Sequence, residues 1–319
     1  MAKSACTDAE FVTLYQELGP HKLSRRLKVN LRAIYTRRAR IEGRAATTIS
    51  SPQSLQSNLL RQSFNPPPGR LLDEIKDGII LIGSDSHYWP GEPYIAHRAF
   101  VQFCKEYKPA IIVKNGDVLD GSSISRHPPI GWEHSPTVQE EIEVCQERLS
   151  EIENSSKNSR LYWPLGNHDA RFETRLATIA PEFAKVRGVH LKDHFPRWRA
   201  CWSVWVNDDV VIKHRFRGGV HAAWTNTLQS GKTTITGHLH SLKVSPFTDY
   251  HGTRWGVDCG TLADPLGPQF MDYTEDNPKD WRPGFIMLSF VNGRLLWPEI
   301  ISVHDDNHVD FRGKLECIS

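Results

Sequence analysis

Five short apolar runs, each ending in a cluster of polar side chains, constrain the fold of this chain more than any other feature. They are KDGIILIGSDSH, PAIIVKNGDVLD, SRLYWPLGNHD, DVVIKHRF and TTITGHLHS. Each apolar run has the length of a buried strand, and helical patterns separate the early ones. Strand–helix–strand order with right-handed crossovers predicts a largely parallel or mixed sheet. Ligands of such sheets lie beyond the carboxyl ends of the strands, so we expect the five clusters to converge.

The chemistry of these clusters indicates a metal centre. Burying many polar groups without partners is costly, and metal coordination removes that cost. Imidazole and carboxylate groups without thiolates suit Mn, Fe, Co, Ni or Zn better than a structural zinc or a calcium site. The spacing of Asp85-x-His87 and of His238-x-His240 predicts two side chains on the same side of an extended segment. The clustered polar residues are Asp85, His87, Asp117, Asp120, Asn167, His168, His214, His238 and His240.

The motif order resembles that of the calcineurin-like metallophosphoesterase superfamily. DSH, GDVLD, GNHD, an isolated His and GHLH follow one another within residues 77–262. The resemblance implies a four-layer αββα sandwich of two mixed sheets. It also implies two divalent ions, for which we expect Mn²⁺, with Fe, Zn, Co or Ni as alternatives. In that family the counterparts of Asp85, His87 and His240 hold the first metal. The counterparts of Asn167, His214 and His238 hold the second metal, and the counterpart of Asp117 binds both metals.

The same resemblance assigns a role to His168, which in the family faces the substrate phosphate and does not bind metal. Asp120 matches the carboxylate that orients this histidine, and a loop cap is the alternative for it. Asp169 is expected to cap the helix that follows. His221 competes with His214 as a ligand, and we prefer His214 because it ends an apolar run whereas His221 follows a Gly-Gly turn.

Two adjacent divalent ions lower the pKa of a bridging water and clamp phosphoryl oxygens, so the expected chemistry is metal-dependent hydrolysis of a phosphate ester. Cationic side chains just after the ligand motifs are candidates for contacts with the substrate phosphate. They are Arg126, His127, Arg171 and Arg215, with Arg217 nearby.

The N-terminal segment differs from the rest in charge. Residues 1–70 hold 12 Lys/Arg and 4 Asp/Glu, whereas the remainder holds 27 and 33. Residues 1–45 show three short helical patterns behind a Thr7–Glu10 capping box, with a break at Gly19-Pro20. The pattern resembles a helix-turn-helix domain, which predicts DNA as a partner; a protein-contact or oligomerisation module and a solvated basic extension are the alternatives. The candidate DNA-binding residues are Arg25, Arg26, Arg32, Arg37, Arg38 and Arg40.

We expect three parts: the basic domain at 1–45, a Ser/Gln/Pro-rich linker at 46–69 with a possible docking segment at Leu59–Phe64, and the metallophosphoesterase domain at 70–319. No apolar stretch approaches the length of a membrane span, and the N-terminus lacks the layout of a secretory signal. Six scattered cysteines are typical of free thiols in a reducing cytoplasm. A bacterial or a phage origin would suit these features.

Three functions remain open. Tyr88, Gly121 and Asp169 depart from the Ser/Thr phosphatase pattern, and the chain looks closer to the branch of DNA exonucleases and phosphodiesterases. The leading hypothesis is therefore a DNA-directed phosphodiesterase, that is, a nuclease or end-processing enzyme. The second is a phosphatase or phosphodiesterase for a nucleotide or another small substrate, with the N-terminal domain for protein contact or oligomerisation. The third is a DNA-binding regulator with an inactive phosphoesterase domain, against which the complete ligand set argues.

Two further patterns carry expectations. Asn292-Gly293 predicts a hairpin turn in the C-terminal segment, which we expect to close the second sheet. The tryptophans at 198, 202 and 205 are expected to pack in the core and at its rim, with base stacking as the alternative.

Overall fold

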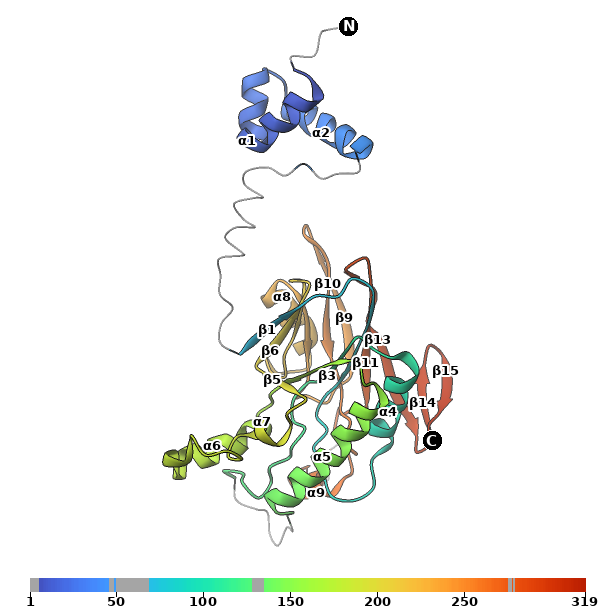
Figure 1. Ribbon diagram of the computed structural model, residues 1–319. Helices are drawn as coiled ribbons and strands as arrows, with labels where there is room; N and C mark the ends of the chain where they lie inside the picture. The colour runs from blue at the N-terminus through green and yellow to red at the C-terminus, as the bar shows by residue number, and fades with distance from the viewer. Residues whose placement is uncertain (1–5, 46–48, 50–68, 128–134, 275–276, 278) are drawn as a thin grey trace. The chain divides into compact units, whose positions relative to one another are not determined.

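The structure is a computed structural model that describes residues 6–45, 49, 69–127, 135–274, 277 and 279–319 (Figure 1). The chain divides into two compact units, residues 1–67 and residues 68–319. Of the predicted linker only Ile49 and Gly69 are described, and the possible docking segment at Leu59–Phe64 lies outside the described residues.

The first unit is helical. Helix α1 (Asp8–Leu27) starts with the predicted capping box, in which Glu10 N donates to Thr7 Oγ1 at 3.2 Å and Thr7 N to Glu10 Oε2 at 2.7 Å. Gly19 leaves the helical conformation with φ 71° and ψ 170°, which confirms the predicted break before Pro20. Helix α2 (Leu31–Ala45) packs against α1. A small apolar core joins the pieces; it consists of Phe11, Tyr15, Leu23, Ile34 and Ile49.

The second unit contains two mixed sheets. The nine-stranded sheet has the order β15-β14-β13-β11-β2-β3-β4-β5, with β12 paired to β11. Its strands are β2 (Gly78–Gly83), β3 (Ile111–Lys114), β4 (Arg160–Pro164), β5 (Arg199–Cys201), β11 (Gly284–Val291), β12 (Arg294–Leu295), β13 (Glu299–Asp305), β14 (His308–Phe311) and β15 (Lys314–Cys317). The six-stranded sheet has the order β1-β6-β7-β8-β10-β9. Its strands are β1 (Arg70–Asp73), β6 (Ser203–Val206), β7 (Val210–Ile212), β8 (Thr233–Thr236), β9 (Lys243–Asp249) and β10 (Gly252–Asp258).

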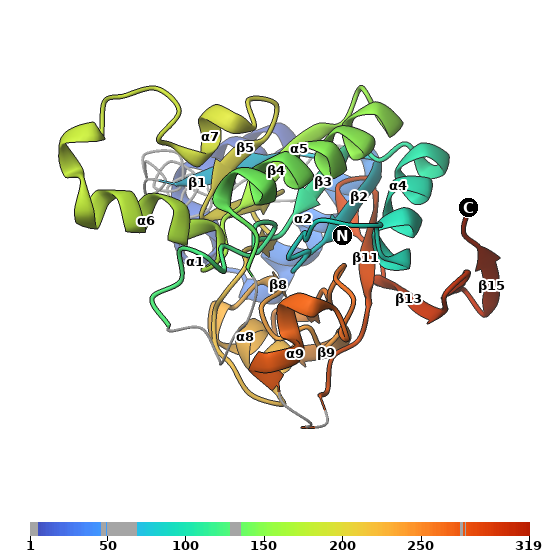
Figure 2. The same cartoon turned by 90° about the horizontal axis from the view of Figure 1, so that it is seen from below.

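Helices cover the outer faces of both sheets. Helices α4 (Ile95–Tyr107) and α5 (Val138–Ser155) lie side by side against the larger sheet (Figure 2). Helix α8 (Ala222–Ser230) packs on β8, β9 and β10 of the smaller sheet. The remaining elements are α6 (Asp169–Ile179), the 3₁₀ turn Pro181–Phe183, α7 (Leu191–His194) and α9 (Pro268–Thr274). The arrangement confirms the predicted four-layer αββα fold.

The period-two alternation of the strands explains the layers. In β2, Ile80 and Ile82 belong to the core between the two sheets, whereas Leu81 belongs to the core beneath α4 and α5. All three side chains are fully buried. Burial on both faces is why this strand reads as a continuous apolar run rather than an alternating one.

The C-terminal segment makes the predicted turn in an unexpected sheet. Phe290 pairs with Leu295 around Asn292 and Gly293, whose φ angles of 51° and 76° fit a two-residue hairpin turn. Strand β11, however, pairs antiparallel with β2. The expectation that this segment closes the second sheet is therefore wrong, because β11 and β13 to β15 extend the sheet that already holds β2, β3 and β4.

The five predicted strands are present as β2, β3, β4, β7 and β8. Strands β2, β3 and β4 are mutually parallel, and β7 is parallel to β8. The loops that follow them therefore leave the sheets at their carboxyl ends and can meet there. No helix in the described part of the chain is long and apolar enough to cross a bilayer.

Candidate metal centre

The loops after four of the five strands are joined in pairs by backbone hydrogen bonds. Asp85 N donates to Gly116 O and His87 N to Asp117 O, both at 2.9 Å, and Gly237 N donates to His214 O at 3.0 Å. These bonds continue the parallel pairing beyond the strands. They bring the polar cluster after β2 next to that after β3, and the cluster after β7 next to that after β8; the backbone N–H of His238 then joins the two pairs by donating to the Asp85 carboxylate.

Five of the seven expected ligands have a left-handed backbone. The φ angles are 50° at Asp85, 38° at His87, 48° at Asp117, 73° at His238 and 58° at His240. This conformation is unfavourable for residues other than glycine and persists where the surrounding structure enforces it, commonly at functional sites. The expectation of extended DxH and HxH segments is therefore wrong in its local geometry.

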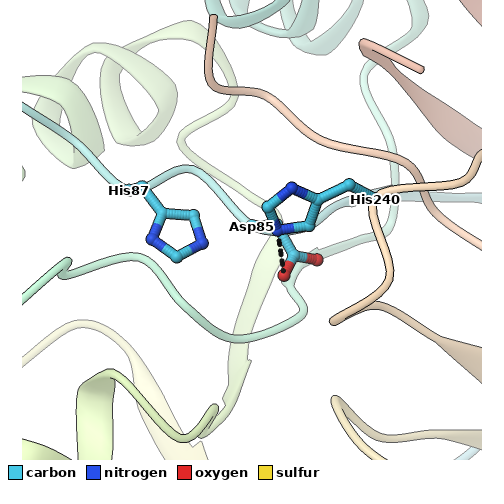
Figure 3. Close-up of side chains that lie close together, drawn as sticks. All are labelled: Asp85, His87 and His240. Atoms are coloured by element: carbon cyan, nitrogen blue, oxygen red, sulfur yellow. Dashed lines mark ion pairs between the residues drawn. The ribbon is translucent and has the colours of Figure 1, made fainter. Parts of the chain in front are cut away.

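The first group of potential ligands consists of Asp85, His87 and His240 (Figure 3). All three are buried, and their ligand atoms lie within 4.8 Å of one another. His240 Nε2 lies 3.2 Å from Asp85 Oδ1. Ser84 Oγ and the backbone N–H of His238 donate to the Asp85 carboxylate and orient it.

The second group consists of Asp117, His214 and His238, with the same 4.8 Å limit between ligand atoms. His214 Nε2 lies 3.0 Å from Asp117 Oδ2, and His214 Nδ1 donates to Asn115 O at 2.7 Å, which directs Nε2 towards Asp117. His221 is exposed at the start of α8 and lies outside the group. The geometry thus favours His214 over His221.

The donor atoms fit divalent metal ions. Three buried atoms of the expected ligands have no hydrogen-bond partner within the described residues: His87 Nε2, Asn167 Oδ1 and His240 Nδ1. Leaving so many polar atoms unpaired is unfavourable, and coordination satisfies them. Nitrogen and oxygen donors without a thiolate suit borderline transition metals, as the sequence indicates.

Electrostatics keeps the carboxylates of the site ionised. Although burial opposes the charged form, His214 and His240 lower the pKa of Asp85 to about 2. The pKa of Asp117 is likewise held well below its ordinary value, against the effect of burial, chiefly by His214. Burial works to lower the pKa of His214, but Asp117 and Asp85 raise it to about 10. The two ionised carboxylates, Asp85 and Asp117, would also attract cations.

Asp120 contacts two histidines at once. His87 Nδ1 lies 2.8 Å from Asp120 Oδ1, which leaves His87 Nε2 free to bind metal. His168 Nδ1 donates to the backbone carbonyl of Asp120 at 2.7 Å and lies 3.3 Å from its Oδ1. Of these two histidines, the sequence predicted only His168 as a partner of Asp120. Burial opposes the charged imidazole, but the pKa of His168 is raised by Asp120 and Asp117.

Asp169 does not cap the helix that follows, so that expectation is wrong. It is the first residue of α6, and its buried carboxylate instead accepts hydrogen bonds from Asp117 N, Val118 N, Leu119 N, Gly166 N and Trp163 Nε1 at 2.8–3.1 Å. Because the Asp169 carboxylate points into the protein, it satisfies four backbone N–H groups from two loops. Asp169 thereby holds the loop that carries Asp117.

The candidate phosphate contacts differ in their surroundings. Arg171 lies at the site, because its guanidinium donates to Asp120 O at 3.0 Å and lies 3.2 Å from His168 Nε2. Arg126 and His127 are exposed neighbours whose side chains approach each other at 3.5 Å. Arg215 lines a hollow whose wall also includes the buried His214 and the exposed His238.

Sequence patterns missed several residues that shape the site. Glu141 of α5 is fully buried and accepts from Gly121 N and Ser122 N, which fixes the chain just after Asp120. A Cβ on Gly166 would lie 2.0 Å from Asp117 Oδ1, so only glycine fits there. The glycine of GNHD was a local signal for such a close approach, whereas Glu141 lies on an ordinary amphipathic helix and gave none.

No family model and no curated protein sequence matches the chain. Among solved structures, a phosphoesterase from E. coli is similar over 69% of this chain and 97% of its own, with 14% identity and a TM-score of 0.32. A dimetal phosphatase from Danio rerio is similar over 77% of this chain and 99% of its own, with 10% identity and a TM-score of 0.37. A protein serine/threonine phosphatase from Saccharomyces cerevisiae is similar over 79% of this chain and 88% of its own, with 13% identity and a TM-score of 0.37. Scores this low assign no activity to the chain.

Proposed function

We propose that the chain hydrolyses phosphate esters with two divalent metal ions. The observation that supports this most is the pair of adjacent carboxylate–imidazole groups with unpaired donor atoms. One ion would be held by Asp85, His87 and His240, the other by Asn167, His214 and His238, and Asp117 would contact both. When bound, two such ions polarise the phosphoryl group and lower the pKa of a water molecule.

His168 and Arg171 would act directly on the substrate. The hydrogen bond from His168 Nδ1 to Asp120 O fixes the tautomer, so Nε2 is the nitrogen that exchanges a proton with substrate. Protonated at Nε2, His168 would give its proton to the leaving oxygen. Arg171, 3.2 Å from that nitrogen, would bind a phosphoryl oxygen.

We further propose that the substrate is DNA. The support is the charge of the first unit, where Arg25, Arg26 and Arg32 are exposed and form no ion pair within the described residues. Exposed cations on helices are the usual contacts to DNA phosphates. They would raise the concentration of DNA near the active site through the tether between the units.

The second candidate is a small-substrate enzyme whose helical unit contacts protein, and the other three candidate arginines are paired within that unit. Arg37 donates to Asp8 at 2.8 Å and to Cys6 O at 2.7 Å. Arg38 donates to Glu42 at 2.8 Å and Arg40 to Asp8 at 3.2 Å. Since these side chains already have acceptors, we place the DNA contact on Arg25, Arg26 and Arg32 alone.

One assay tests both levels of the proposal. Full-length protein with Mn²⁺ is given end-labelled duplex and single-stranded DNA and, separately, a chromogenic phosphodiester, with Asp117→Ala alongside. Turnover of DNA that Asp117→Ala abolishes supports a nuclease, and the product lengths show whether cleavage starts from ends. Turnover of the diester alone would select the second candidate, and undiminished turnover by Asp117→Ala would contradict the metal-dependent mechanism.

The role of the first unit is tested by Arg25→Gln/Arg26→Gln/Arg32→Gln in the full chain. We expect a higher KM for DNA without a change in turnover of the chromogenic diester, because only long polyanions reach that unit. Arg37→Gln is a poor probe of DNA contact, since it would break the interaction with Asp8.

A further inference from the structure

A cationic groove lies beside the second ligand group. It is a hollow of about 540 Å³ whose wall includes both His214 and His238. One loop supplies its three cationic side chains, which are Lys213, Arg215 and Arg217. Two aromatic side chains, Trp202 and Phe216, also line it.

The groove is built to receive an anion. No Asp or Glu lines it, and no ion pair engages Lys213, Arg215 or Arg217 within the described residues. Lys213, Arg215 and Arg217 thus bring three like charges into one hollow, where they repel one another. A phosphodiester backbone would relieve this repulsion.

Two aromatic side chains in the groove are open to solvent. Phe216 is 44% exposed and Trp202 54% exposed. They differ from Trp198, which is buried and donates from Nε1 to Glu153, as expected for a core tryptophan. Lys213 Nζ lies 5.0 Å from the centre of the Phe216 ring. An exposed ring next to cations is the surface on which unpaired bases stack.

The loop that carries Lys213, Arg215, Phe216 and Arg217 is held by hydrogen bonds at both ends. Lys213 N donates to Ile235 O at 3.0 Å and Arg217 N donates to the side-chain oxygen of Asn226 at 3.0 Å. Asn226 is itself buried in α8. The three cations and Phe216 are therefore presented by an ordered loop, which lowers the entropic cost of binding.

We propose that the cationic groove holds a single-stranded stretch of the polynucleotide next to the phosphate to be cleaved. Arg215 and Arg217 bind backbone phosphates, and an unpaired base stacks on Phe216, the ring that lies next to the Lys213 ammonium. The enzyme accordingly prefers single-stranded or frayed DNA over intact duplex, independently of the helical unit. This inference rests on the proposed phosphoesterase function, which it deepens by naming the form of the substrate.

Binding is tested with full-length protein in EDTA, so that the probe stays intact. The probe is a single-stranded oligonucleotide carrying 2-aminopurine, whose fluorescence is quenched when the base stacks. We expect quenching by the wild type, its loss in Phe216→Leu and its recovery in Phe216→Tyr. Phe183→Leu is the matched control, because Phe183 is similarly exposed (49%) outside the groove. Quenching that survives Phe216→Leu would overturn the proposal.

Catalysis gives the second readout, in Mn²⁺. For Arg217→Gln and Phe216→Leu we expect the KM for the single strand, relative to that for a chromogenic diester, to rise about tenfold. Arg187→Gln, which removes an exposed arginine outside the groove, should leave this ratio as it is. An unchanged ratio in the groove variants would contradict the proposal. If no ester is hydrolysed while quenching still depends on Phe216, the groove stands and the proposed catalytic function fails.

Discussion

The carboxylate of Asp169 accepts the backbone N–H of Asp117 at 2.9 Å, and so one buried aspartate holds the other in the strained conformation that the site requires. Asp117 has φ 48°, and the next two N–H groups along the chain also point to Asp169. Burial and the nearby charge of Asp117 raise the pKa of Asp169, so this anchor is costly to keep ionised. The hydrogen bonds offset that cost.

Asp169→Asn should destabilise the protein and weaken metal binding. The amide nitrogen cannot accept a hydrogen bond, so at least two buried N–H groups lose their partner, at roughly 1–3 kcal/mol each. We expect a lower Tm and reduced metal content after dialysis. The exposed Asp209→Asn is the control. An Asp169→Asn protein with the Tm and metal content of the wild type would show that the loop does not need this anchor.

His168→Gln should affect esters according to their leaving groups. If His168 protonates the leaving oxygen, its removal costs about 10²–10⁴-fold in kcat for an alkyl ester and much less for p-nitrophenolate, which leaves without a proton. The comparison is made on paired substrates at saturating Mn²⁺. His221→Gln, at an exposed site, should alter neither rate. Equal losses on both esters would instead indicate that His168 only binds the phosphate.

His214 and His221 offer a matched pair for the second metal. His214→Ala removes a buried imidazole next to Asp117, and we expect metal content to fall from about two to about one per chain. His221→Ala should keep both ions, because that side chain lies outside the ligand groups. Metal analysis after gel filtration measures this. Two ions retained in His214→Ala would remove His214 from the ligand set.

Lys114 should make stability depend on pH. It is fully buried, and burial lowers its pKa to about 7. Between pH 7 and 10 the unfolded chain therefore binds the proton and the folded chain does not, so the free energy of unfolding should rise with pH by up to about 1.4 kcal/mol per unit. Lys114→Met should flatten this slope in urea unfolding at pH 7, 8 and 9, whereas the exposed Lys105→Met should not. Equal slopes in Lys114→Met and the wild type would mean that Lys114 stays charged in the fold.

Local patterns predicted the strands that carry the polar clusters and the start of the first helix. The apolar runs are the strands β2, β3, β4, β7 and β8, and the predicted capping box begins α1 at Thr7. Asn292-Gly293 turns as expected, since its residues tolerate positive φ. Each of these signals lies within a few residues of the feature that it specifies.

Features that depend on distant partners were beyond such patterns. Nothing near Asp85 or His240 encodes a left-handed backbone, which arises because loops from two sheets must meet. Asp169 lies at a helix start, where aspartates commonly cap the helix. Its carboxylate instead accepts the backbone N–H groups of Asp117 and Val118, more than 40 residues away in the sequence. The sheet that β11 joins is decided by its pairing with β2, a contact across 200 residues of chain.

The most direct test of the central claim is a titration of the metal-free full-length protein with Mn²⁺, following hydrolysis of a chromogenic phosphodiester. The two-metal site predicts no turnover in EDTA and a rate that rises until about two equivalents are bound. Asp117→Asn should show little turnover at any Mn²⁺ concentration. Full activity without metal, or a rate that saturates at one equivalent, would contradict the account.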